Sequence, residues 1–259
     1  MTTEKLSKRQ LQLLHLLYRF RFLTNHHMQQ FLNHKNSTRI QQWLKQLNTN
    51  NYILSDYDRS TFETNRKPAI YCLASNSKRI LEKEKDCDNL LLKRIYKEKT
   101  RSQAFKERQL VIADFYFLFV AAYTQAEKLV FFTSTDLVGY DYLPHPFPDA
   151  YIAVKNKTKS SRYFLEVLDE TIKKSVVFGK VTKYFRYIEQ GDWQAQTDKS
   201  FPKILFIAPD ERRRRLLKRS IQEKFEQSYE TELQFFVTTR EKIQNEGLTT
   251  GIWEKVAIE

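Results

Sequence analysis

Three runs of apolar residues at spacings of three and four positions predict three helices in the first fifty residues. The first covers about residues 7–20. Hydroxyl side chains, Thr24 and Ser37, are placed to cap the second and third helices. The apolar stripes are Leu13, Leu14, Leu17 and Phe20 in the first helix, Met28, Phe31 and Leu32 in the second, and Ile40, Trp43, Leu44 and Leu47 in the third.

A strand pair is expected directly after these helices. Residues 52–57 and 68–73 read as strands, and the polar segment between them contains Arg59, Arg66 and Lys67. Three helices with a polar turn before the third, followed by a hairpin, form the pattern of a winged helix-turn-helix. Basic residues at the tip of such a hairpin are placed to contact phosphates beside a DNA groove.

The third predicted helix has a polar face opposite its apolar stripe. Glutamine can pair with an adenine edge and arginine with a guanine edge, so this face has the chemistry of base recognition in the major groove. The alternative is an ordinary solvated helix face, where glutamine and lysine are also common. The candidate DNA-binding residues are Thr38, Arg39, Gln41, Gln42 and Lys45, together with Arg59, Arg66 and Lys67 from the hairpin.

The second half of the chain predicts an α/β domain. A helix over about 102–126 precedes strands near 129–133, 149–154 and 162–168, then a helix at 174–190 and a strand at 203–208. A helix at 211–226 and a strand at 233–237 follow. This order, α-β-β-β-α-β and then α-β, implies helices covering a sheet. Because the pattern breaks around residue 86, we expect a winged-helix domain at 1–86 and an α/β domain at 87–259.

The order of elements in this second domain is similar to the restriction-endonuclease-like core. That core carries an aspartate at the start of its second strand and an acid-x-lysine on its third, which here point to Asp149 and Glu166. Both carboxylates would hold Mg²⁺ to activate water against a phosphodiester. The signature lysine falls at Leu168, so we expect a degenerate, non-catalytic site unless Lys180 or Lys183 supplies the missing charge. Pairing of Glu166 with a basic residue for structure alone is the other interpretation.

The charge of the chain indicates a partner, and its composition argues against several classes of function. The net charge is +13, and residues 1–80 hold 13 Lys/Arg against 4 Asp/Glu, whereas residues 101–259 hold 25 against 22. A basic segment of this kind attracts polyanions, above all nucleic acid. No glycine-rich phosphate loop occurs, the only cysteines are Cys72 and Cys87, and no apolar run is long enough to span a membrane. We therefore expect a cytoplasmic protein without a disulfide framework, a membrane partner or a resident cofactor.

Several motifs resemble the replication-relaxation family of plasmid and conjugative-element proteins over about residues 10–210. They are Pro68-Ala69-Ile70-Tyr71-Cys72-Leu73, Phe147-Pro148-Asp149-Ala150, the segment from Phe164 to Thr171, and Lys183-Tyr184-Phe185-Arg186-Tyr187. The family often has Glu-x-Asp where this chain has Glu166-Val-Leu-Asp169. The resemblance implies DNA binding in replication or transfer of a mobile element, with a relaxase or replication protein as partner.

The leading hypothesis is thus a double-stranded DNA-binding accessory protein, possible as a homodimer, that is not itself an enzyme. Three alternatives stay open. The first is a Mg²⁺-dependent endonuclease using Asp149 and Glu166, the second a winged-helix transcriptional regulator, and the third a scaffold that binds only protein.

Overall fold

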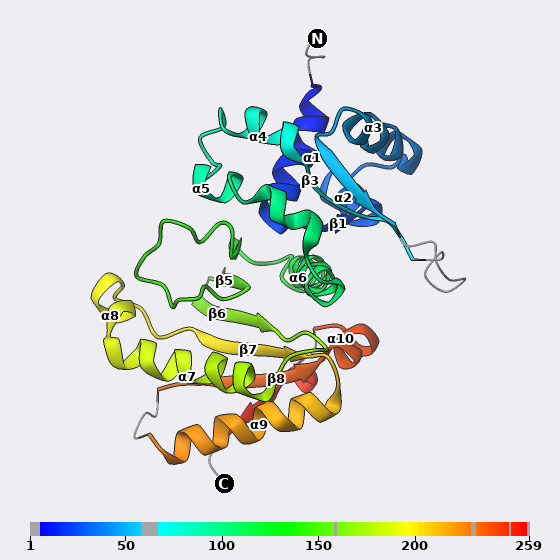
Figure 1. The fold of residues 1–259 in the computed structure, drawn as a ribbon. Coiled ribbons are helices and arrows are strands. Elements are labelled where there is room, and N and C mark those ends of the chain that lie inside the picture. Colours follow the sequence, from blue (N-terminus) through cyan, green and yellow to red (C-terminus); the bar gives the residue numbers. More distant parts are fainter. Residues whose placement is uncertain (1–5, 58–66, 158–159, 229–231, 249, 258–259) are drawn as a thin grey trace. The chain divides into compact units, whose positions relative to one another are not determined.

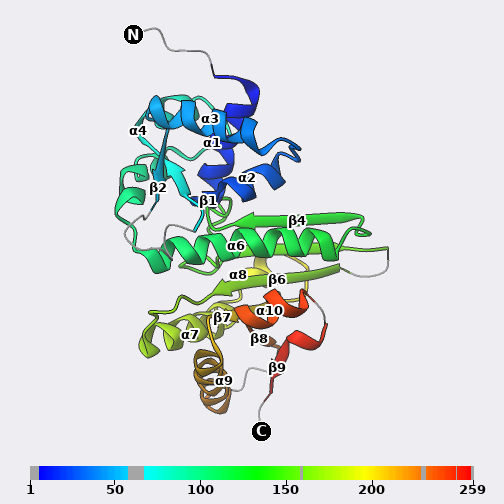
Figure 2. The same ribbon diagram turned by 90° about the vertical axis from the view of Figure 1, so that its right-hand side faces the viewer.

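The computed structural model describes residues 6–57, 67–157, 160–228, 232–248 and 250–257. The chain divides into two compact units, Met1–Asp114 and Phe115–Glu259, and the division falls within helix α6 (Gln103–Ala122). Figures 1 and 2 show the elements of both units. Among the described residues, no helix combines the length and apolar composition needed to cross a bilayer.

The first unit begins with three helices: α1 (Lys8–Phe20), α2 (Asn25–Phe31) and α3 (Ser37–Thr49). Ser7 caps α1 and Thr24 caps α2, each in a capping box that satisfies amides at the helix start. The predicted cap at Ser37 is wrong. The helix begins at Ser37 itself, so Asn36 occupies the cap position, and its side-chain oxygen accepts from the Arg39 N–H at 3.1 Å.

A small antiparallel sheet completes this unit. Its strands are β1 (Leu23–Thr24), β2 (Ile53–Asp56) and β3 (Ile70–Leu73), in the order β1-β3-β2. The predicted strand pair after the third helix is therefore present. Strand β1 was not predicted, since two residues carry no periodic signal. Of the predicted hairpin-tip residues, Arg59 and Arg66 lie outside the described residues.

The chain continues through short helices α4 (Ser75–Leu81), α5 (Asn89–Leu92) and η2 (Ile95–Thr100). This segment packs within the first unit: the Asp88 N–H donates to the Tyr18 hydroxyl at 2.7 Å, and Arg21 pairs with Glu98 at 2.5 Å. For this reason the compact units divide after Asp114, whereas the sequence placed a domain boundary after Asp86. The assignment of domains remains a prediction.

The second unit contains a mixed sheet in the order β4-β5-β6-β7-β8-β9. Strands β4 (Lys128–Thr133), β5 (Ala150–Lys155) and β6 (Ser160–Val167) pair antiparallel, whereas β6, β7 (Lys203–Ala208) and β8 (Phe235–Thr239) run parallel. Strand β9 (Glu254–Val256) closes the edge antiparallel to β8. The predicted α-β-β-β-α-β order is confirmed. Strand β9 and helices α8 (Asp192–Gln196) and α10 (Arg240–Glu246) were not predicted, because they are too short to show a period.

Helices α7 (Lys174–Gln190) and α9 (Glu211–Glu226) lie against one face of this sheet (Figure 1). The core between them is apolar and rich in aromatic rings, such as Phe164, Phe185 and Phe235. Because side chains alternate along a strand, Glu166 points to the same face as Phe164 and Leu168. A carboxylate therefore lies inside an apolar core, which requires partners.

Candidate functional site

Two places in the chain gather the residues predicted from the sequence. The first is the polar face of α3. Its apolar stripe is buried at Ile40, Leu44 and Leu47, which leaves the opposite face to solvent. All five predicted residues on that face are exposed: Thr38, Arg39, Gln41, Gln42 and Lys45.

Arg39 lies at the centre of this face. Its Nη1 donates to Gln42 Oε1 at 3.2 Å, and its guanidinium lies 5.6 Å from the Trp43 ring centroid. His34 meets the same ring edge-on at 5.3 Å. These contacts hold the arginine without neutralising its charge, since none of the partners is a carboxylate. Trp43 and His34 were not predicted to support it.

The sequence around α3 is basic. Residues 5–55 contain no Asp or Glu at all. Lys67, from the predicted hairpin tip, is exposed just before β3. A surface of this composition attracts a polyanion through charge and offers amide and guanidinium groups that can recognise bases.

His15 and His27 contact other residues of the first unit. Thr24 and His27 cap α2 through each other, and His27 Nε2 contacts Asp114 Oδ1 at 2.9 Å. His15 lies 3.5 Å from Glu84. Among the described residues, no group of three His, Cys, Asp or Glu side chains is arranged to hold a metal ion.

The second place is the cluster around Glu166, whose side chain is fully buried. Lys183 Nζ lies 2.5 Å from Glu166 Oε1, and the Tyr184 hydroxyl donates to the same oxygen at 2.8 Å. Lys180 Nζ donates to the other oxygen. Lys183 also donates to the Pro146 carbonyl at 3.0 Å. We refer to Glu166, Lys180, Lys183 and Tyr184 as the buried charge cluster.

The spacing of the cluster on α7 explains how it forms. Positions 180, 183 and 184 lie on one helical face, where residues three and four apart are neighbours. The sequence singled out Lys180 and Lys183 as possible sources of the missing signature charge, and it named Tyr184 within a motif of the family resemblance. Its hydroxyl could have been suspected, because a buried tyrosine normally finds a hydrogen-bond partner.

The charges determine the protonation of the cluster. Burial alone would raise the pKa of Glu166, but Lys180 and Lys183 outweigh it and hold this pKa at about 2. Burial lowers the pKa of Lys183, and Glu166 opposes that effect. Burial and the neighbouring Glu166 raise the pKa of Tyr184 well above its usual value. The glutamate is thus a carboxylate with both oxygens occupied by donors.

Asp149 is nearly buried beside the cluster, at 6% exposure. Its Oδ2 accepts from the Val167 N–H at 2.8 Å, which extends the β5–β6 pairing by a side-chain bond. Leu168 is fully buried, so the position of the signature lysine is part of the apolar core. The structure therefore brings Asp149, Glu166, Lys180 and Lys183 together. As donors for Mg²⁺ they fit poorly, because two ammonium groups already neutralise Glu166.

A cleft of about 590 Å³ opens beside Lys183. Residues of α7, including Phe178, Thr182 and Arg186, line one side, and the segment from Leu143 to Pro146 lines the other. Lys183 is therefore the member of the cluster that both binds Glu166 and borders the cleft.

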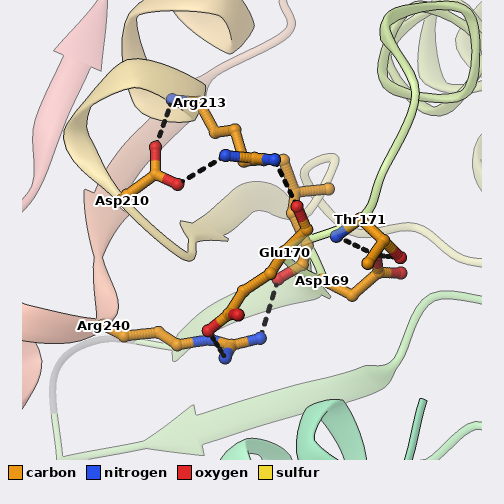
Figure 3. Close-up of polar contacts among 7 residues, drawn as sticks. Asp169, Glu170, Thr171, Asp210, Arg213 and Arg240 are labelled. Atoms are coloured by element: carbon orange, nitrogen blue, oxygen red, sulfur yellow. Dashed lines mark hydrogen bonds and ion pairs between the residues drawn. The ribbon is translucent and has the colours of Figure 1, made fainter. Parts of the chain in front are cut away.

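The acidic residues that follow Glu166 are engaged in another network, at the carboxyl ends of the parallel strands (Figure 3). Asp169 accepts from the N–H and the hydroxyl of Thr171, at 3.0 and 2.9 Å. Arg240 donates to the Leu168 carbonyl at 3.0 Å and lies 3.7 Å from Glu170. These contacts tie the β6–α7 loop to the start of α10.

The basic run at the start of α9 is partly neutralised by the same kind of pairing. Arg213 contacts Asp210 at 2.7 Å and donates to the Glu170 carbonyl, as Figure 3 shows. Arg214 pairs with Glu211 and Glu254. Arg212, Arg215 and Arg219 remain exposed. This run contributes to the cohesion of the second unit more than its sequence suggests.

Comparison with known proteins places these features in a family. The family model for replication-relaxation proteins matches residues 14–204 of this chain. No curated protein matches the chain. Among solved structures, the restriction endonuclease FokI is similar at 14% identity and a TM-score of 0.33, over 97% of this chain and 47% of that one.

FokI bound to DNA is similar at 13% identity and a TM-score of 0.32, over 97% of this chain and 48% of that one. The chain thus spans about half the length of each of these structures. The family match covers most of the chain, including α3 and the buried charge cluster, and confirms the resemblance seen in the sequence. The chain belongs to the replication-relaxation family.

Proposed function

We propose that this protein is a double-stranded DNA-binding accessory protein in the replication or transfer of a plasmid or conjugative element. The observation that carries the proposal is the exposed face of α3. It presents Arg39, Gln41, Gln42 and Lys45 in a segment without a single carboxylate. Membership of the replication-relaxation family supports the biological setting.

The first unit would act as a winged helix-turn-helix, with α3 as the recognition helix in the major groove. Strands β2 and β3 would form the stem of the wing, and Lys67, with Arg59 and Arg66, would contact phosphates. The Arg39–Gln42 pair is oriented before binding, so less side-chain entropy would be lost on contact with a base pair.

The second unit would be a restriction-endonuclease-like core that has lost catalysis and serves as a protein interface or a phosphate contact. Its element order and the positions of Asp149 and Glu166 support this assignment. The charge of Glu166 is balanced by Lys180 and Lys183, which supports a structural role for the buried charge cluster. A relaxase or a replication protein is the expected partner.

The experiment selects duplexes from a random pool with the wild-type protein and measures their affinity by fluorescence anisotropy. Arg39→Ala with Gln42→Ala should weaken binding to the selected duplex roughly tenfold or more and reduce its preference over a scrambled duplex. Arg79→Ala is the matched control, because Arg79 is also an exposed arginine of this unit but lies on α4. Equal affinity and preference for the double variant and the control would refute the proposal.

A Mg²⁺-dependent endonuclease is the second candidate. It is favoured by one observation: Asp149, Glu166 and two lysines do come together, so α7 supplies the lysines that β6 lacks. In this function Asp149 and Glu166 would hold the metal, whose chemistry is to activate water, and Lys183 would face the phosphate from the cleft. The present pairing of both Glu166 oxygens disfavours it.

A further inference from the structure

The second unit has an aromatic pocket on the sheet face opposite α7 and α9. Phe236 lies on this face because its neighbour Phe235 belongs to the core on the other side. The pocket has a volume of about 290 Å³. Its walls are Phe115, Phe119, Tyr123, Tyr163, Lys203, Leu205, Phe236, Leu248 and Trp253. Neither the family nor the proposed function assigns it a role.

The aromatic walls are fixed in place by one another. The ring centroids of Phe115 and Phe119 lie 5.8 Å apart in a stacked arrangement. Trp253 meets Phe115 edge-on, and Tyr163 meets Phe119 edge-on, each with ring centroids 6.3 Å apart. Burial, together with Tyr163, raises the pKa of Tyr123 to about 12, and a hydrogen bond joins these two side chains. Aromatic walls can pack against a flat ring, either face to face or edge-on.

The charge of the pocket selects the kind of ring. Lys203 is the one charged residue among the nine that line it, and its ammonium lies 5.6 Å from the Phe236 ring centroid. An aromatic cage without a lysine would attract cations. Here the ammonium repels a cation and attracts an anion. A planar aromatic group that carries a negative charge therefore fits best.

We propose that this pocket binds an unpaired nucleotide, with the base among the aromatic walls and the phosphate near Lys203. The volume lies at the lower end of ordinary small-molecule sites, which suits one base rather than a larger ligand. Stacking of bases on aromatic side chains is the usual way in which proteins hold single-stranded DNA. The choice of a nucleotide among aromatic anions rests on the proposed DNA function.

The test titrates the full-length protein with dAMP and follows tryptophan fluorescence. Wild type should show saturable quenching, and Trp253→Phe should lose it, since Trp43 and Trp193 lie outside the pocket. Lys203→Gln should weaken dAMP binding roughly tenfold, and deoxyadenosine, which lacks the phosphate, should bind wild type correspondingly weakly. Leu248→Trp should fill the pocket and abolish binding.

Lys224→Gln is the matched control. Lys224 also lies over an aromatic ring, 5.8 Å from the Phe185 centroid, but outside the pocket. It should bind dAMP as wild type does. Absence of saturable quenching in wild type, or equal affinities for Lys203→Gln and Lys224→Gln, would overturn the proposal.

Two further measurements follow. The first identifies the source of the ligand, and the second distinguishes failure of the pocket proposal from failure of the proposed duplex function. An unpaired DNA 12-mer that displaces dAMP and binds more tightly would identify a DNA strand as the ligand, whereas failure to displace dAMP would overturn that assignment. Duplex affinity of Leu248→Trp should equal that of wild type. If duplex binding persists but dAMP does not bind, the pocket proposal fails alone. If dAMP binds but the selected duplex does not, the proposed duplex function fails alone.

Discussion

The face of α3 and the buried charge cluster both concentrate cationic side chains, but these side chains are exposed on α3 and buried in ion pairs in the cluster. On α3, Arg39 and Lys45 are exposed, and no carboxylate occurs nearby in the sequence. In the cluster, Lys180 and Lys183 are turned inward onto Glu166. Exposed charge without an internal partner is available to an external polyanion, whereas charge paired in the core is not, and it becomes uncompensated when its partner is removed. The sequence alone shows lysines in both places and does not separate these roles.

The largest expected effect comes from removing the central carboxylate. Glu166→Gln should lower the free energy of unfolding by about 3–5 kcal/mol, because it leaves two ammonium groups in the core without a counter-charge. Urea denaturation measures this loss. Adding Lys183→Met to Glu166→Gln should recover part of it. A loss below about 1 kcal/mol would show that the cluster is solvated like a surface pair.

The free energy of unfolding should depend on pH through the same cluster. The pKa of Glu166 is held at about 2, below its usual 4.5, so its stabilisation is complete above pH 4.5 and is lost as the pH falls toward 2. The contribution is up to about 3 kcal/mol. The stability difference between wild type and Glu166→Gln should therefore narrow between pH 5 and about pH 2. A difference that stays constant over this range would contradict the assigned ion pairing.

The face of α3 should respond in binding rather than in stability. Lys45→Ala should weaken duplex affinity several-fold and reduce the slope of log affinity against log salt by about one, because one counterion fewer is released. Its free energy of unfolding should change by less than about 0.5 kcal/mol, since the side chain is exposed. Anisotropy at several salt concentrations and a urea titration measure the two quantities. An unchanged salt slope would remove Lys45 from the interface.

The smallest effect is expected at an exposed ion pair. Lys78 on α4 and Glu82, the C-cap residue of this helix, lie 3.5 Å apart, and both side chains are more than a third exposed. Glu82→Gln should change the free energy of unfolding by less than about 1 kcal/mol. This variant sets the scale against which Glu166→Gln is read. A change as large as that of Glu166→Gln would mean that burial does not distinguish the two pairs.

Much of the fold follows from periodicity in the sequence. Residues 174–190 and 211–226 were predicted as helices with the bounds of α7 and α9, because each carries a long stripe of apolar positions. Some of the short elements, such as β1, β9 and α10, carry too little periodic signal and were missed. Strand β1 pairs with β3 and strand β9 with β8, so both depend on partners elsewhere in the sequence.

The candidate sites also differ in how much of each could be predicted from the sequence. The face of α3 could be predicted because its chemistry and its exposure both follow from helical spacing. Lys180 and Lys183 could be named as candidates, but their pairing with Glu166 could not, since it depends on how α7 lies on β6. Tyr184 was named within the family motif, and the partner of its hydroxyl could not be predicted because it depends on how α7 lies on β6. The aromatic pocket draws Phe119, Lys203 and Trp253 from three distant segments and leaves no pattern in the sequence.

The most direct test of this contrast is to incubate supercoiled plasmid with the pure protein and Mg²⁺ and to follow it on an agarose gel. An accessory DNA-binding protein with a structural charge cluster should retard the plasmid and leave it intact, and Asp149→Ala should behave like wild type. Arg39→Ala with Gln42→Ala should weaken the retardation. Open-circle or linear DNA that appears with wild type and disappears with Asp149→Ala would contradict the account and make the buried cluster a catalytic site.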